Sequence, residues 1–130
     1  MKIAFLVDTA PELTESIKEK LERFDYASIP TLNAEEIDQA GKQMGQVAIC
    51  FTDSKKAYSF LKTNKWPFKT LNLLFLKGKP IISDDAAKKI REVNLDLVVL
   101  KDENQFKEVI ARFENTKEDT LDDIEFAFKG

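Results

Sequence analysis

The sequence predicts a single α/β domain built around a mostly parallel β-sheet. Five times along the chain, a short apolar run of strand type precedes a segment whose apolar residues recur at helical spacing. The runs at 3–7, 47–51 and 71–76 show no alternation of apolar and polar residues, which is typical of strands covered by helices on both faces. Alternating strand–helix units joined by right-handed crossovers form sheets of this kind.

The ten predicted elements follow one another in strict alternation. In the first helix, Leu13, Ile17, Leu21 and Phe24 recur at helical spacing, and Pro11 lies near its start, where a missing N–H is harmless. We expect strands and helices, in chain order, at 3–7, 11–24, 26–32, 34–44, 47–51, 54–64, 71–76, 84–93, 97–100 and 104–113. Asn33 and Ser83 are expected as N-caps of the second and fourth helices, and Phe60 and Phe106 are among the core residues of the third and fifth.

Pro30 indicates the order of the strands. It lies in the second strand and cannot donate a hydrogen bond to a neighbour, so that strand belongs at an edge of the sheet. Strand two is an edge in the order 2-1-3-4-5 but interior in the order 3-2-1-4-5-6. The predicted fold is therefore a flavodoxin-like (βα)5 three-layer sandwich with strand order 2-1-3-4-5. Such sheets bind ligands beyond the carboxyl ends of their strands.

The composition limits which chemistry and which compartment we expect. The absence of histidine removes the commonest general base and zinc ligand. The only cysteine, Cys50, cannot form an internal disulfide and lies in an apolar strand, where a thiol is usually inert. No apolar run is long enough to span a bilayer, and the first residues lack a signal-peptide pattern. We therefore expect a cytoplasmic protein that does not bind membranes.

The charge distribution divides the chain into a domain at 1–115 and an acidic tail or linker at 116–130. The tail has two lysines and five acids, which leaves 18 basic and 18 acidic side chains in the domain. Its sequence Ile124-Glu125-Phe126-Ala127-Phe128 alternates apolar and polar residues as a strand does. We expect this segment to dock, either on this domain or on another chain.

A segment rich in lysine and aromatic residues lies at 54–79 and contains no acid. Basic side chains interleaved with aromatic rings can bind single-stranded nucleic acid. Because residues 1–115 are neutral as a whole, we do not expect a nucleic acid, and we favour a solvated surface with Phe60 in the core. An acidic protein segment, the tail included, is the more plausible partner. The basic–aromatic patch contains Lys55, Lys56, Lys62, Lys65, Lys69, Lys77 and Lys79, with Tyr58, Phe60, Trp66 and Phe68.

Two stretches resemble the receiver domains of bacterial two-component signalling. The run Asn94-Leu95-Asp96-Leu97-Val98-Val99-Leu100-Lys101 is similar to the family's fifth strand and its lysine, and Phe5-Leu6-Val7-Asp8 is similar to the first strand and its first acid. The resemblance covers roughly residues 2–115. It implies that acids after the first and third strands hold Mg²⁺, that the acid after the third strand accepts a phosphoryl group, and that Lys101 pairs with the phosphate.

The chain departs from that family at several of these positions. Thr9 stands in place of the second acid, Lys77 in place of the switch hydroxyl, and Asp102 in place of a proline. The acceptor position falls on Asp53 by its interval from Asp8, or on Cys50 or Phe51 by strand register. We therefore interpret the chain as a degenerate receiver, a pseudo-receiver, in which Lys77 beside Lys101 acts as a built-in cation at the acidic edge.

The expected function is a phosphorylation-independent signalling module that acts by protein–protein contact, without catalysis and without a cofactor. One alternative is a phospho-accepting receiver that uses Asp53, with Mg²⁺ held by Asp8 and Asp53. Another is a flavodoxin-like ligand-binding domain or enzyme. The structural alternative for Asp8 and Asp53 is that each caps a helix. The structural alternative for Lys101 is that it is a solvated surface side chain. The resemblance implies a partner or homodimer face on the fourth helix, fifth strand and fifth helix, with Lys88, Arg91, Lys107 and Arg112.

Overall fold

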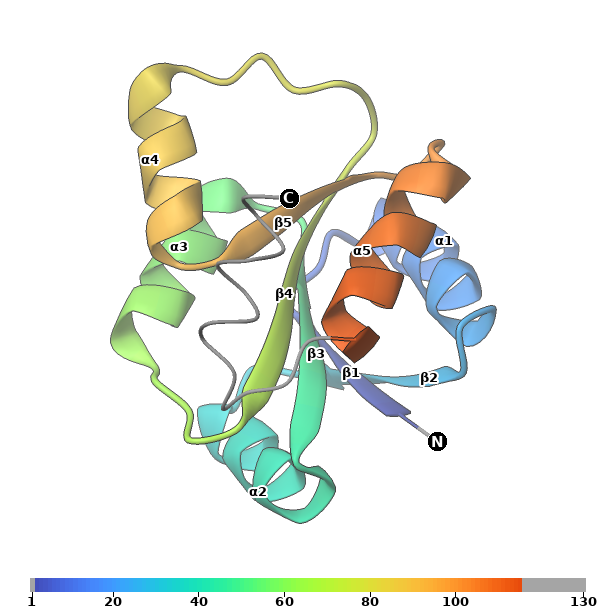
Figure 1. Cartoon of the computed structure of the whole chain (residues 1–130), viewed down its shortest axis with the longest axis vertical. Coiled ribbons are helices and arrows are strands. Elements are labelled where there is room, and N and C mark those ends of the chain that lie inside the picture. The colour runs from blue at the N-terminus through green and yellow to red at the C-terminus, as the bar shows by residue number, and fades with distance from the viewer. Residues whose placement is uncertain (1, 116–130) are drawn as a thin grey trace.

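The computed structural model describes residues 2–115, in which five strands alternate with five helices (Figure 1). Residue 1 and residues 116–130 lie outside the described residues, and so does the predicted strand-like segment at 124–128. In chain order the elements are β1 (Lys2–Val7), α1 (Pro11–Glu22), β2 (Tyr26–Thr31), α2 (Ala34–Met44), β3 (Gln46–Phe51), α3 (Ser54–Thr63), β4 (Lys69–Leu76), α4 (Asp84–Glu92), β5 (Leu95–Val99) and α5 (Glu103–Asn115).

The five strands form one parallel sheet in the order β2-β1-β3-β4-β5, which confirms the predicted topology. Pro30 lies on the edge strand β2, level with Leu6 of β1. An edge position leaves the missing N–H of a proline without consequence for the ladder. Cys50 of β3 lies level with Leu6 on the other side of β1, so the carboxyl ends of β1 and β3 meet at one edge of the sheet.

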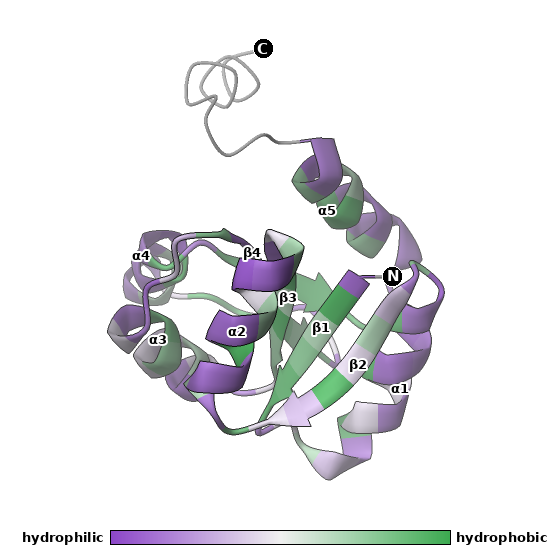
Figure 2. Cartoon of the chain, turned by 90° about the horizontal axis from the view of Figure 1, so that it is seen from below, coloured by the Kyte–Doolittle hydropathy of each residue, from purple (hydrophilic) through white to green (hydrophobic). Residues whose placement is uncertain are grey.

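Two apolar clusters cover the two faces of the sheet and make it the middle of three layers (Figures 1 and 2). On one face, Ile17 of α1 and Phe106 of α5 are fully buried against the strands. On the other face, Ile37 of α2 and Ala57 of α3 are fully buried, whereas α4 contributes no buried residue. Burying an aliphatic or aromatic side chain contributes about 1.5–3 kcal/mol, so these helix–sheet contacts hold the layers together.

Local sequence signals explain where the helices begin. The side chains of Asn33, Asp53 and Ser83 each accept a hydrogen bond from a backbone N–H in the first turn of α2, α3 and α4, as the predicted caps do. Pro11 occupies the first turn of α1, where its missing N–H has no helical partner to lose. These caps stabilise the helix starts that lie along the carboxyl edge of the sheet.

The observed boundaries differ from the predicted ones most at β5. That strand spans Leu95–Val99 rather than 97–100, because Leu95 is buried and pairs with Asn72 of β4. Leu100 instead begins a turn, although its N–H still donates to the carbonyl of Leu76. β4 likewise starts two residues earlier than predicted, at Lys69.

A close approach between α2 and the loop before β4 explains why residue 41 is a glycine. A Cβ atom added at Gly41 would lie 2.0 Å from the ring of Phe68, so only glycine leaves room for that ring. Among residues 2–115, no helix combines the length and apolarity needed to cross a bilayer.

Candidate functional site

The candidate site lies at the carboxyl edge of the sheet, where β1 and β3 end. Asp8 follows β1, and Thr52 and Asp53 follow β3 at the same edge. Asp8 has a positive φ of 48°, a left-handed conformation that aspartate adopts more readily than most residues. This turn directs the chain into α1 and leaves the carboxylate of Asp8 facing the start of α3.

The first turn of α3 contacts both acids. The Nζ atom of Lys56 lies 2.6 Å from Oδ2 of Asp8, and this hydrogen bond and the charge of Asp8 hold the pKa of Lys56 above its usual value. The backbone N–H of the same residue donates to Oδ1 of Asp53 at 3.0 Å. Lys56 therefore joins the two carboxylates that the resemblance assigns to metal binding and phosphoryl transfer.

The structure separates the alternatives for these two acids. Asp53 is the N-cap of α3, as its structural alternative predicts. Asp8 is not a cap of α1, because the N-cap of that helix is Ala10. The N–H of Ala10 donates to Oγ1 of Thr52 at 2.9 Å, a bond that fixes the loop after β1 against the loop after β3. Thr9 directs its hydroxyl to that of Thr14, 3.1 Å away.

The lysine predicted to serve as the built-in cation is not the one at the acids. Lys77 is exposed in the loop after β4, and Lys101 is exposed after β5. Among residues 2–115, no ion pair or hydrogen bond joins either of them to Asp8 or Asp53; the cation beside Asp8 is Lys56. The prediction for Lys77 is therefore wrong. Lys56 lies in the first turn of α3 and contacts Asp8, whereas Lys77 begins the exposed loop between β4 and α4.

The acids at this edge do not fit the magnesium site that the resemblance implies. Mg²⁺ is usually held by one or two carboxylates, with water and other oxygens completing an octahedral geometry. Here one oxygen of Asp8 binds an ammonium group and one oxygen of Asp53 caps a helix. In the part of the chain that the structure describes, no three Asp, Glu, His or Cys side chains cluster as metal ligands would.

When the chain is aligned with the receiver family by strand register, the phosphoryl-acceptor position falls on Cys50 or Phe51. Both are buried in the core clusters, and burial raises the pKa of the Cys50 thiol. Asp53 is exposed at the edge of the sheet and is the acid at the end of β3 that solvent reaches. The strand-register assignment therefore leads to residues that no phosphoryl donor can approach.

An open groove of about 920 Å³ adjoins Asp8 on the side of β2. It lies between the loops that follow β1 and β2. Sequence reasoning placed Asp8 and Thr9 at this edge but missed Thr14, Glu15 and Glu36, which line the groove from the first two turns of α1 and the first turn of α2. The groove is lined by the apolar Leu6, Pro11, Pro30, Leu32 and Ala34, the polar Thr9, Thr14, Thr31 and Asn33, and the acidic Asp8, Glu15 and Glu36.

The aromatic members of the basic–aromatic patch pack inward rather than forming a surface platform. Phe60 lies 5.7 Å from Phe51, and Trp66 lies 6.4 Å from Phe60 and 5.7 Å from Phe68, measured between ring centroids. All four rings belong to or pack against the second apolar cluster. This arrangement agrees with the structural alternative for the patch, in which Phe60 is a core residue.

Several lysines of that patch have partners within the domain. Lys56 binds Asp8, Lys62 binds Glu92 of α4, and Lys69 donates to the carbonyl of Phe113 at the end of α5. Lys55, Lys65, Lys77 and Lys79 are exposed. The basic surface that remains available is therefore smaller than the sequence indicates and includes the two lysines of the loop after β4.

The predicted partner face has both free and engaged charges. Lys88, Arg91 and Lys107 are exposed on α4 and α5. Arg112 donates to Asp96 of β5 at 2.6 Å. Burial raises the pKa of Asp96, and the charge and hydrogen bond of Arg112 oppose that rise without cancelling it.

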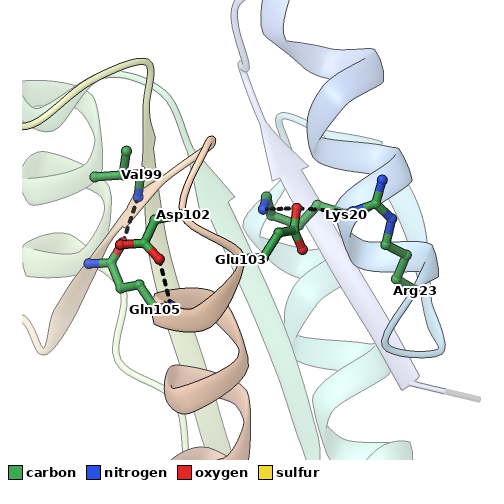
Figure 3. Close-up of polar contacts among 6 residues, drawn as sticks. All are labelled: Lys20, Arg23, Val99, Asp102, Glu103 and Gln105. Atoms are coloured by element: carbon green, nitrogen blue, oxygen red, sulfur yellow. Dashed lines mark hydrogen bonds and ion pairs between the residues drawn. The ribbon is translucent and has the colours of Figure 1, made fainter.

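The edge strand β5 is partly covered by a side chain. The N–H of Val99 donates to Oε1 of Gln105 at 2.8 Å (Figure 3), and Nε2 of Gln105 donates to the carbonyl of Leu97 at 2.8 Å. One amide group thus makes the pair of bonds that a residue of a neighbouring parallel strand would make. Asp102 holds Gln105 in place by accepting its backbone N–H.

An ion pair joins α1 to α5. Lys20 is almost completely buried, and its Nζ donates to Oε1 of Glu103 at 2.8 Å, while Arg23 binds the same oxygen at 2.9 Å (Figure 3). The hydrogen bond from Lys20 is the largest of the effects that lower the pKa of Glu103. Lys20 was missed at the sequence level, although its position falls on the apolar stripe that contains Ile17 and Phe24.

Comparisons of the chain with protein-family models, with curated proteins and with solved structures find no match. The functional argument therefore depends on the flavodoxin-like architecture and on the contacts at its carboxyl edge. Of those contacts, the ion pair between Lys56 and Asp8 bears most directly on which chemistry the edge can support.

Proposed function

We propose that this chain is a phosphorylation-independent protein-interaction module of pseudo-receiver type. The observation that carries the proposal is the 2.6 Å contact between the ammonium group of Lys56 and the carboxylate of Asp8. In a phospho-accepting receiver the acids of this edge would serve a divalent cation instead. Phosphoryl transfer needs that cation to neutralise the charge that develops on the phosphoryl oxygens.

The contacts of α3 support a single stable arrangement of the edge. Lys56 supplies positive charge to Asp8, and its backbone N–H binds Asp53, so the loops after β1 and β3 are fixed to the same helical turn. The bond from Ala10 to Thr52 adds a second connection between these loops. A module whose edge is held by its own side chains presents one surface to partners without any modification.

The proposed partner is another protein, bound at the face formed by α4, β5 and α5. The exposed cations of this face, Lys88, Arg91 and Lys107, would give orientation and specificity more than raw affinity. Gln105 already satisfies part of the backbone of β5, so the side chains of α4 and α5 rather than the strand edge would make the contacts. The partner proposed for this face is a second copy of the chain.

Acyl-phosphate labelling tests the first half of the proposal. The full chain is incubated with acetyl phosphate and Mg²⁺, and its intact mass is measured beside those of the Asp53→Asn and Lys56→Ala variants. We expect no phosphoryl adduct on the unmodified chain. An adduct that is present in the unmodified chain and lost in Asp53→Asn would show a true phospho-acceptor and overturn the proposal.

Sedimentation velocity over a range of concentrations tests the second half. Self-association through the proposed face should weaken in Arg91→Glu, because the reversal adds a like-charge or unpaired contact. Lys55→Glu, which reverses an exposed lysine on α3, serves as the matched control and should sediment as the unmodified chain does. Equal behaviour of the two variants would exclude this face as a homodimer interface.

The groove beside Asp8 favours a second candidate function, the binding of a small ligand. Its polar lining consists mainly of hydroxyl and carboxylate oxygens, and apolar side chains such as Leu6 and Pro30 line it as well. Such a lining fits a small organic amine with an apolar body, because the amine donates to the oxygens and the body contacts the apolar side chains. Shifts of the Thr9, Thr14 and Thr31 amide signals on titration with alkylamines would favour this function, and unchanged signals would exclude it.

A further inference from the structure

The loop at 77–83, between β4 and α4, exposes two adjacent isoleucines. Ile81 is fully exposed and the adjacent Ile82 is 38% exposed. The helix that follows, α4, contains no buried residue, so this corner of the domain has little core of its own. Two exposed lysines, Lys77 and Lys79, precede the isoleucines. A complementary partner would therefore combine apolar side chains with acids.

The chain itself contains a segment of that composition. Residues 116–130 hold five acids against two lysines and account for the whole net negative charge of the protein. Apolar residues alternate with others at its end, in Ile124, Phe126 and Phe128. The tail is thus acidic where the loop at 77–83 is basic, and both segments carry apolar side chains.

The geometry of the domain limits which tail residues can reach the loop. The end of α5 is held beside the starts of β4 and β1, because Lys69 donates to the carbonyl of Phe113 and Lys2 pairs with Glu114. The loop lies at the opposite end of β4, a strand of eight residues, which corresponds to about 26 Å. A docked tail must therefore run back along the sheet by at least that distance.

An extended chain advances about 3.3 Å per residue. Counted from Asn115, Leu121 can reach roughly 20 Å, which is too short, whereas Phe126 and Phe128 can reach roughly 36 Å and 43 Å. The acids between these positions would then pass the lysines of the loop. The reach of the chain thus selects the last apolar residues of the tail and excludes Leu121.

We propose that Phe126 and Phe128 dock on Ile81 and Ile82 of the same chain, with the acids at 122–125 facing Lys77 and Lys79. The contact would cover the one corner of the described domain where two adjacent aliphatic side chains are exposed. It goes beyond the proposed function, since it concerns neither the acids of the carboxyl edge nor the α4–β5–α5 face. A second copy of the chain and an anionic membrane are the competing occupants of the loop.

Paramagnetic relaxation in the full-length chain tests the proposal. A nitroxide is attached at position 127 in Ala127→Cys; the native Cys50 is fully buried and does not compete for the label. We expect loss of the amide signals of Ile81 and Ile82. In a mixture of spin-labelled unenriched chain and unlabelled ¹⁵N-enriched chain, the same signals should persist, because the contact is within one chain. Loss in the mixed sample would instead show docking between copies and overturn the proposal.

Matched variants separate the apolar and ionic parts of the contact. Phe126→Ala with Phe128→Ala should restore the loop signals in the spin-labelled chain, whereas Leu121→Ala should not. Lys77→Glu and Lys79→Glu should each lower the docked population roughly two- to fivefold, as expected for exposed ion pairs. Intact loop signals in the spin-labelled chain, or equal effects of Leu121→Ala and the double phenylalanine variant, would refute docking at this loop. Loss of the loop signals on addition of anionic vesicles alone would assign the loop to a membrane instead.

Discussion

The ion pair between α1 and α5 gives the sharpest test of how this domain is held together. Replacing Glu103 with Gln keeps the size and shape of the side chain but removes its negative charge. The ammonium group of Lys20 would then be buried without an anion at 2.8 Å, with the ring of Phe106 at 5.5 Å. Glu103 lies in the first turn of α5, where a carboxylate also favours the helix dipole.

The expected loss of stability follows from the exposure of the two partners. The side chain of Lys20 is 4% exposed and that of Glu103 is 52% exposed, so the pair lies between a fully buried and a surface ion pair. Breaking a fully buried pair costs about 3–5 kcal/mol and an exposed pair contributes about 0–1 kcal/mol. We therefore expect Glu103→Gln to lower the free energy of unfolding by about 1–3 kcal/mol at neutral pH.

The pH dependence of that loss distinguishes the ion pair from simple packing. The pKa of Glu103 is lowered in the folded protein, so its contribution is fully present above the unfolded pKa of about 4.3. The contribution of Glu103 is lost as the pH falls through the lower pKa that Glu103 has in the folded protein. Urea unfolding of the two proteins should thus differ most near neutral pH and converge in strong acid.

Two controls complete this experiment. Arg23→Gln removes the exposed partner of the same carboxylate and should change stability by less than about 1 kcal/mol. Lys20→Met removes the buried charge itself while filling its space, and should be less harmful than Glu103→Gln. A difference between the unmodified chain and Glu103→Gln that stays constant from neutral to acidic pH would refute the ion-pair explanation.

Three further changes test other contacts of the fold. Gln105→Ala should lower stability by about 1–3 kcal/mol and speed hydrogen exchange of the Val99 amide, since two edge bonds are lost. Asp96→Asn should raise the free energy of unfolding at neutral pH, because the raised pKa of Asp96 means that the folded protein disfavours the ionised carboxylate. In acid, where Asp96 is protonated, the variant should lose this advantage. Gly41→Ala should destabilise the domain despite a helix propensity gain of about 1 kcal/mol, because its Cβ would meet the ring of Phe68; an unchanged melting temperature would contradict this.

The fold followed from the sequence because local and global signals agree. Apolar runs without alternation marked the covered strands, and Pro30 placed β2 at the edge of the sheet. The caps Asn33 and Ser83 were correct because side-chain oxygens at those positions bind their own helix starts. These features depend on residues close together in the chain.

The contacts of the candidate site were predicted less well because they join distant segments. The sequence argument assigned the cation to Lys77, because no sequence pattern shows that α3 brings Lys56 to Asp8 while Lys77 remains exposed. Asp8 was weighed as a cap for α1, yet the loop continues two residues further before that helix begins. Such contacts depend on loop paths, which no periodic pattern specifies.

A magnesium titration followed by amide NMR tests the central claim that Lys56 takes the place of a metal at the carboxyl edge. We predict that the signals of Asp8, Asp53 and Lys56 do not shift with Mg²⁺ in the unmodified chain. In Lys56→Ala the freed carboxylates should give weak but saturable shifts at Asp8 and Asp53. Saturable shifts of equal size in both proteins would contradict the claim, because the lysine would then not occupy the acids.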